Sequence, residues 1–315
     1  MNQKLILVTG VTGYIGGRLV PLLLEAGYHV RVLARDRQRL QGRAWLEQVE
    51  VFEGDVLAPD SLTSALTGVD AAYYLIHSMR SSAGYIQRDL QAARNFGSAA
   101  HASGVGHIIY LGALGDPGTD LSPHLRSRQQ TGQVLKESGV PVTEFRAAIV
   151  VGSGSISYEM IHYLTERLPV LICPRWVFQR VQPIAIDDVL DYLISALDTP
   201  ESAGRIIEIG GSNVLTYGDM MLGYARARGL RRILLTVPVL TPRLSSYWIH
   251  LVTPIHASVA RPLIDGLRDE VIVCDHSARN LFPHIQPMDY QSAVALALSA
   301  ASAGVYHIKS NRHSG

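Results

Sequence analysis

The sequence has few of the residues that would tie it to a disulfide framework, a metal site or a nucleic acid. Its 315 residues include two cysteines, Cys173 and Cys274, far apart in the chain. Such a pair argues against a disulfide scaffold or a zinc site and suits a reducing compartment. The formal net charge is only +1, which gives no reason to expect a nucleic acid or an anionic membrane. We therefore predict a cytoplasmic protein with no metal site and no nucleic-acid partner.

Long apolar runs are also missing. Residues 244–260 and 290–308 are uncharged, but both contain too many Ser, His, Gln or Pro residues for a membrane span. The N-terminus enters an apolar strand at once, so we expect no transmembrane segment and no signal peptide. The apolar content of 47% in 315 residues can build one large α/β domain, or a domain with an added lobe.

The clearest positive signal is a glycine-rich turn at residues 5–16. An apolar strand precedes Gly10, Gly13 and Gly16, and an amphipathic helix ended by Gly27 follows them. The amides at such a helix start favour an anion, so we predict a diphosphate site, although an ordinary strand-to-helix turn remains the alternative. The predicted contacts within this turn are Gly10, Thr12, Gly13, Tyr14, Ile15 and Gly16.

Two later strand ends supply the other predicted cofactor contacts. Arg35 follows the second strand, about twenty residues after the glycines, where an arginine pairs with a ribose 2′-phosphate. Asp55 and Val56 follow the third strand and are candidates for the adenine site. Arg35, with Arg37 close behind it, favours NADP(H) over NAD(H). The alternatives are a solvated surface role for Arg35 and a turn-capping role for Asp55.

The turn Thr9–Gly16 resembles the fingerprint of the extended and atypical short-chain dehydrogenase/reductases. The whole chain is similar to their bacterial NAD(P)H-binding members, which are related to NmrA-like regulators and to an accessory subunit of respiratory complex I. Residues 174–188 and 241–253 carry the more specific part of this likeness. The resemblance implies an α/β fold, a doubly wound parallel sheet of the Rossmann type with a smaller C-terminal lobe.

The residues expected to act on the substrate depart from the family pattern. Active members carry a Tyr-x-x-x-Lys helix, whereas His124 and Arg128 stand in these places here. Arg128 can bind ribose or phosphate but cannot act as a base, while His124 is the one candidate for proton transfer. The alternative is that the ordinary alcohol/ketone chemistry is lost and that the pair is structural or binds the cofactor. Gly112 and His77, at two strand ends, are further candidates for cofactor contact, with a purely structural role as the alternative for His77.

The resemblance also suggests how the chain is divided. We expect a dinucleotide-binding domain over residues 1–151, with strand six at 142–151. Residues 152–315 form a mixed region that returns to the core at 182–211, where Asp187 or Asp188 is expected to cap a helix. Apolar, proline-broken segments such as 245–259 suit a substrate pocket or, equally, a second core.

Two functions follow from these expectations. The first is an NADP(H)-dependent oxidoreductase that passes hydride to a small apolar acceptor, such as a quinone or an activated double bond, without the Tyr/Lys mechanism. The second is a non-catalytic NAD(P)(H) sensor or assembly factor, which the missing Tyr/Lys pair favours. Fold alone does not separate them.

Overall fold

The computed structural model describes residues 4–77, 84–237, 254 and 264–302. Its centre is a seven-stranded sheet in the order β11-β6-β5-β4-β1-β2-β3, parallel throughout. The strands are β1 (Leu5–Thr9), β2 (His29–Ala34), β3 (Glu50–Glu53), β4 (Ala71–Tyr74), β5 (His107–Ala113), β6 (Val142–Ala147) and β11 (Ile206–Ile209). This is the predicted doubly wound fold.

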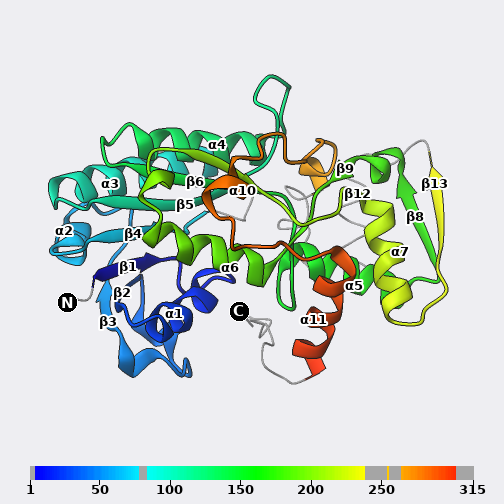
Figure 1. Ribbon diagram of the computed structural model, residues 1–315, viewed down its shortest axis with the longest axis horizontal. Helices are drawn as coiled ribbons and strands as arrows, with labels where there is room; N and C mark the ends of the chain where they lie inside the picture. The colour runs from blue at the N-terminus through cyan, green and yellow to red at the C-terminus, as the bar shows by residue number, and fades with distance from the viewer. Residues whose placement is uncertain (1–3, 78–83, 238–253, 255–263, 303–315) are drawn as a thin grey trace.

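Helices cover both faces of the sheet, as Figure 1 shows. One face carries α1 (Gly16–Glu25) and α6 (Ile186–Ser195). The other carries α2 (Asp60–Leu66), α3 (Tyr85–Ala102) and α4 (Pro123–Lys136). The strands are apolar on both sides because each side faces a helical layer: in β1, Ile6 packs into the core under α1 and Leu7 into the opposite core.

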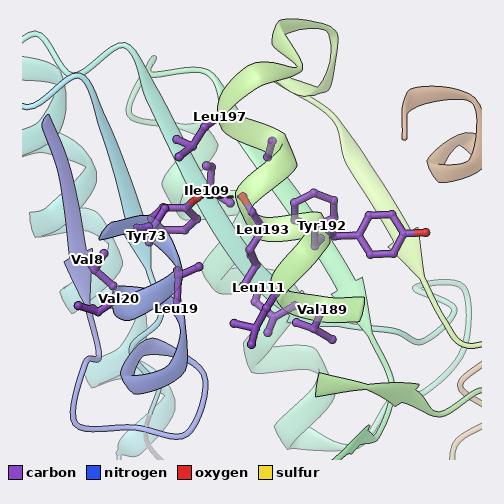
Figure 2. Close-up of a cluster of buried hydrophobic side chains, with 14 of the residues drawn as sticks. Val8, Leu19, Val20, Tyr73, Ile109, Leu111, Val189, Tyr192, Leu193 and Leu197 are labelled. Atoms are coloured by element: carbon purple, nitrogen blue, oxygen red, sulfur yellow. Dashed lines mark hydrogen bonds between the residues drawn. The ribbon is translucent and has the colours of Figure 1, made fainter. Parts of the chain in front are cut away.

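The core beneath α1 and α6 is shown in Figure 2. Leu19 and Val20 of α1 and Val189 and Leu193 of α6 are almost wholly inaccessible to solvent and pack on the central strands. The buried hydroxyl of Tyr73 in β4 donates a hydrogen bond of 2.8 Å to the Leu193 carbonyl. The polar tip of this aromatic ring is thus satisfied, which a buried tyrosine requires.

A second set of elements forms the C-terminal part of the molecule around its own apolar cluster. Its helices are α5 (Ile156–Arg167), α7 (Tyr217–Ala227) and α11 (Tyr290–Ser302), and a short helix, α10 (Ser277–Leu281), lies nearer the main sheet. Its strand pairs are β7 (Val150–Val151) with β10 (Ile184–Ala185), β9 (Arg180–Val181) with β12 (Leu215–Thr216), and β8 (Val170–Pro174) with β13 (Ile233–Val237). The domain boundary at residue 151 stays a prediction.

Two local expectations were wrong. The expected strand 142–151 is broken, because β6 stays in the main sheet while β7 leaves it to pair with β10. The expected cap of α6 by Asp187 or Asp188 is also absent: the N-cap is Ala185, without a side-chain bond. Asp188 instead lies within the first turn and accepts a hydrogen bond of 3.0 Å from the Met288 amide.

Some expectations fall outside the described residues. These include nearly all of the proposed lobe segment 245–259. Among the described residues, none of the helices combines the length and the apolar character that a bilayer crossing needs.

Candidate functional site

A cavity of about 860 Å³ opens where β1, β2, β4 and β5 end. It lies at the point of the strand order where β1 neighbours β4, which is where doubly wound sheets bind ligands. Twelve of the thirteen predicted site residues line it: Gly10, Thr12, Gly13, Tyr14, Ile15, Arg35, Asp55, Val56, His77, Gly112, His124 and Arg128. Their roles toward a cofactor stay predictions.

The glycine turn shapes one wall of the cavity through its backbone. Gly10 has φ +69, and a Cβ there would collide with the Leu75 carbonyl of the neighbouring chain segment. A Cβ on Gly16 would come within 2.6 Å of the Gly10 carbonyl oxygen. Gly16 is therefore buried against the turn, and it is the one predicted residue that does not line the cavity.

Gly13 is placed differently from the other two glycines. It is exposed on the cavity wall, and its amide donates to the Gly10 carbonyl at 2.8 Å. The turn then runs directly into α1, where the first amides of a helix lack partners within the helix. This end of the cavity offers backbone donors and the positive end of a helix dipole, as a phosphate requires.

The arginine side of the cavity contains one residue that sequence reasoning missed. Arg35 and Arg39 both line the wall, whereas Arg37 between them does not. The intervening Asp36 caps the short helix Arg37–Leu40, and its carboxylate accepts from the Gln38 amide at 2.8 Å. Because the chain turns helically here, Arg35 and Arg39 reach the cavity wall and Arg37 does not. The spacing of the arginines along the sequence does not show this.

The segment after β3 forms a structured turn beside the cavity. Asp55 Oδ1 accepts from the Leu57 amide at 3.0 Å, and the Asp55 amide donates to Ser61 Oγ at 3.1 Å. The turn-capping role considered for Asp55 is thus real. It coexists with a position on the cavity wall, where Val56 lies beside it.

The opposite wall holds the two residues that replace the family's Tyr and Lys. Arg128 lies 5.1 Å above the ring of Tyr110 and hydrogen-bonds to the Leu111 carbonyl. Its Nη1 is buried and has no hydrogen-bond partner among the described residues. A buried guanidinium N–H without a partner is costly, so this atom suits a polar ligand group in the cavity.

His124 lies one helical turn before Arg128 on α4. Burial and the nearby charge of Arg128 lower the pKa of His124 to about 4. The imidazole is therefore neutral at pH 7. It can exchange hydrogen bonds with a ligand, but it does not carry the additional proton that a general acid would deliver.

Several lining residues come from the C-terminal part of the chain and were not predicted. They include Tyr217 and Leu267. Tyr217 and Leu267 also line a second, apolar cavity of about 70 Å³ among α5, α7 and β8. Residues this far apart in sequence carry no spacing signal, and only the fold brings them to one wall.

The donor set fits an anionic ligand, such as a nicotinamide dinucleotide, better than a metal ion. Glycine amides, Arg35, Arg39 and the unpartnered Arg128 Nη1 are all hydrogen-bond donors that suit anions. Within the described ranges, no group of three or more His, Cys, Asp or Glu side chains is arranged to hold a metal ion.

Two known proteins are similar to this chain in sequence. A photosystem II assembly factor, Ycf39 of Cyanophora paradoxa, is 27% identical over 240 residues, covering 74% of this chain and 72% of its own. A (4-alkanoyl-5-oxo-2,5-dihydrofuran-3-yl)methyl phosphate reductase of Streptomyces griseus is 28% identical over 233 residues, covering 71% and 74%.

Among solved structures, the NADPH-dependent quinone oxidoreductase QOR2 of Escherichia coli superposes with a TM-score of 0.73. It covers 92% of this chain and 98% of its own at 19% identity, so the likeness is one of fold. The sequence model of the NmrA-like family matches residues 2–236, three quarters of the chain. The chain therefore belongs to the NmrA-like family.

Proposed function

We propose that the large cavity binds NADP(H) and that the protein passes hydride from it to an apolar acceptor. The observation that carries this proposal is the gathering of the glycine turn, Arg35 and Arg39, and the pair His124 and Arg128 around one cavity of about 860 Å³. A dinucleotide needs a diphosphate site, a ribose site and an apolar wall along one such cleft.

Each part of the cofactor has a candidate contact. The amides of the turn from Gly10 to Ile15, apart from that of Gly13, which is already bonded to Gly10, bind the diphosphate. Arg35 and Arg39 bind the 2′-phosphate. Asp55 and Val56 hold the adenine, with Asp55 remaining fixed by its bond to the Leu57 amide. Gly112 and His77 lie farther along the cleft, and Arg128 Nη1 donates to a ribose or amide oxygen there.

The protonation state of His124 indicates which kind of acceptor the site can reduce. The bound cofactor supplies the hydride, and the chain supplies orientation and exclusion of water. Because the pKa of His124 is lowered to about 4, this side chain is not an imidazolium at neutral pH. An acceptor that takes hydride without a strong acid, such as a quinone or an activated double bond, suits this site.

The names of similar proteins support the same reading. QOR2, which shares the fold, is an NADPH-dependent quinone oxidoreductase, and its structure holds NADPH. The Streptomyces griseus relative is a reductase. A lipophilic acceptor also suits the apolar residues of the C-terminal cluster, including Tyr217 and Leu267 on the cavity wall.

The test is direct binding followed by turnover. We expect calorimetry to show NADPH binding, and a quinone panel to give steady NADPH oxidation. Replacing Arg35 and Arg39 together by Ser should weaken NADPH binding on the order of 100-fold while changing NADH binding little. Arg37→Ser is the matched control, because Arg37 belongs to the same run but lies off the cavity wall. No response to millimolar NADPH or NADH overturns the proposal.

A second candidate, a non-catalytic NADP(H)-binding assembly factor, has one specific observation in its favour. Ycf39, to which the chain is 27% identical, is an assembly factor. This candidate predicts NADPH binding without turnover against any acceptor, together with a marked difference in affinity between NADPH and NADP⁺. Steady oxidation of NADPH by an acceptor would exclude this non-catalytic function.

A further inference from the structure

The strand pair β8–β13 exposes a face of aliphatic side chains at the end of the molecule farthest from β3 (Figure 1). Val170 and Ile172 in β8 are 37% and 45% exposed, and their register partners Ile233 and Leu235 in β13 are 62% and 52% exposed. The alternate residues point inward, where Leu171 is buried in the C-terminal core. We call these four exposed side chains the outer face.

Arginines collect where both strands of the outer face begin. Residues 226–232 contain four arginines and no acidic residue, and Arg167 ends α5 just before β8. Arg232 is held against the end of α5 by hydrogen bonds to the Thr165 and Glu166 carbonyls. Arg228 pairs with Glu166 at 2.7 Å.

Two of these arginines are available to a ligand outside the chain. Arg226 and Arg231 are both exposed, and neither guanidinium group has a hydrogen bond or ion pair within the described part of the protein. The concentration of positive charge is local, because the whole chain carries a net charge of only +1. At 0.1 M salt, charges more than about 10 Å away are largely screened. The arginine cluster therefore attracts nearby anions even though the chain as a whole is almost neutral.

We propose that the outer face and its arginines dock the protein on the surface of an anionic phospholipid membrane. Aliphatic side chains enter the interfacial region while neighbouring guanidinium groups meet lipid phosphates, the combination by which peripheral proteins bind such surfaces. Four partly exposed side chains amount to a few hundred Å², below the roughly 800 Å² per partner of a stable protein interface. A second copy of this chain is therefore the less suitable occupant.

The interior behind the outer face supports the same occupant. The buried residues Leu171 and Cys173 of β8 line the small apolar cavity, so its wall and the outer face share one strand. Tyr217 and Leu267 separate this cavity from the large one. A molecule dissolved in a membrane would meet apolar groups from the docked face inward to the candidate site.

The test is sedimentation with vesicles of phosphatidylcholine alone and of phosphatidylcholine with 30% phosphatidylglycerol. Two double variants remove one component each: Ile233→Ser with Leu235→Ser, and Arg226→Gln with Arg231→Gln. The matched control is Arg205→Gln with Ile206→Ser, an exposed pair beside β11 at the edge of the main sheet. We expect binding to anionic vesicles only, weakened on the order of ten-fold or more by each test variant and unchanged in the control.

Other outcomes overturn the proposal. These are equal binding to both vesicle types, no binding to anionic vesicles, or loss of binding in the control alone. A dimer that the Ile233→Ser, Leu235→Ser variant dissociates would assign the outer face to a second copy instead. Vesicle binding is measured without NADPH, so its failure and the failure of the proposed function are separate results. Circular dichroism of each variant checks that the fold is kept.

Discussion

The two ends of the large cavity are built in different ways. At the glycine end, which comprises Gly10 to Ile15 and the turns holding Arg35 and Asp55, backbone conformation decides the shape. At the lobe end, which comprises His124, Arg128, Tyr217 and Leu267, side chains from three separate segments form the wall. The glycine end, which the backbone shapes, is suited to binding a part of the ligand that all family members share. The lobe end, which side chains form, is suited to a part of the ligand that varies among family members, because substitutions change side chains more easily than the path of the backbone.

The largest expected effect tests whether backbone conformation decides the glycine end. Gly10→Ala should lower the free energy of unfolding by about 3 kcal/mol, because φ +69 disfavours a side chain and the Cβ would collide with the Leu75 carbonyl. Gly42→Ala is the control: φ is +79 there, but nothing lies within 4 Å of the added Cβ. It should cost only about 1 kcal/mol in urea unfolding. Equal costs for the two variants would mean that the tight approach to Leu75 is unimportant.

The next prediction concerns the lobe end, where one side chain should matter for binding. Arg128→Gln should weaken NADPH binding about 10- to 100-fold, because it removes the buried Nη1 donor that has no partner within the described protein. Arg126→Gln, on the same helix, is the control. Arg126 pairs with the exposed Asp120 at 2.5 Å, and such surface pairs contribute little. Calorimetric affinities that are equal for both variants would remove Arg128 from the site.

The contrast between the ends explains what the sequence could predict. The glycine turn, Arg35 and Asp55 are set by short-range spacing after strands, so their placement on one cavity followed from pattern alone. Arg39 was missed because Asp36 starts a helical turn that brings it, and not Arg37, to the wall. Tyr217 and Leu267 were missed because their approach depends on packing of α5, α7 and the segment after residue 264, for which no local pattern exists.

The broken sixth strand shows the same limit. Residues 142–151 were expected to form one mainly apolar strand, interrupted by Glu144 and Arg146, but β6 pairs within the main sheet and β7 pairs with β10 outside it. A hydrophobic run in the sequence predicts that the segment is buried, but it does not predict which strand or helix packs against it. Likewise, an aspartate at a predicted helix start suggests a cap, yet Asp188 bonds to Met288, a hundred residues later.

A pH prediction compares His124 at the lobe end with His107, which lies away from the cavity and has a similarly lowered pKa. Burial lowers the pKa of both His107 and His124 to about 4, aided by Lys4 for the first and Arg128 for the second. Below pH 6.5 these histidines are protonated in the unfolded chain but still neutral in the folded protein. The free energy of unfolding therefore decreases as the pH falls from 6.5 toward 4. After allowance for partial exposure, each contributes about 1–2 kcal/mol to this loss.

Variants of the two histidines should differ in only one respect. His107→Asn and His124→Asn should each reduce the loss of unfolding free energy between pH 7.5 and 5. Only His124 lines the cavity, whereas His107 bonds to Thr143 Oγ1 at 2.7 Å away from it. The pH dependence of NADPH affinity should therefore change in His124→Asn and stay as in the parent protein in His107→Asn. The same change in both variants would contradict a ligand-facing His124.

The smallest effect concerns the junction between the main sheet and the C-terminal part, where Asp188 of α6 accepts from the Met288 amide. Burial, with the charges of Asp191 and Asp187, raises the pKa of Asp188 to about 6, although the bond from Met288 opposes this shift. A raised carboxyl pKa means that the folded protein binds the proton more tightly. The charged form therefore costs stability once the pH rises through 4 to 6, and the full cost is present at pH 7.

Asp188→Asn keeps an oxygen for the Met288 amide and removes the buried charge. It should raise the free energy of unfolding by about 1 kcal/mol at pH 7.5, and this gain should vanish near pH 4, where the parent carboxyl is already protonated. Asp187→Asn, next along the same helix but more exposed, should change stability by less than half as much. Urea unfolding at the two pH values measures both variants. A loss of stability in Asp188→Asn at pH 7.5 would show that the junction depends on the charge of Asp188 and not only on its hydrogen bond.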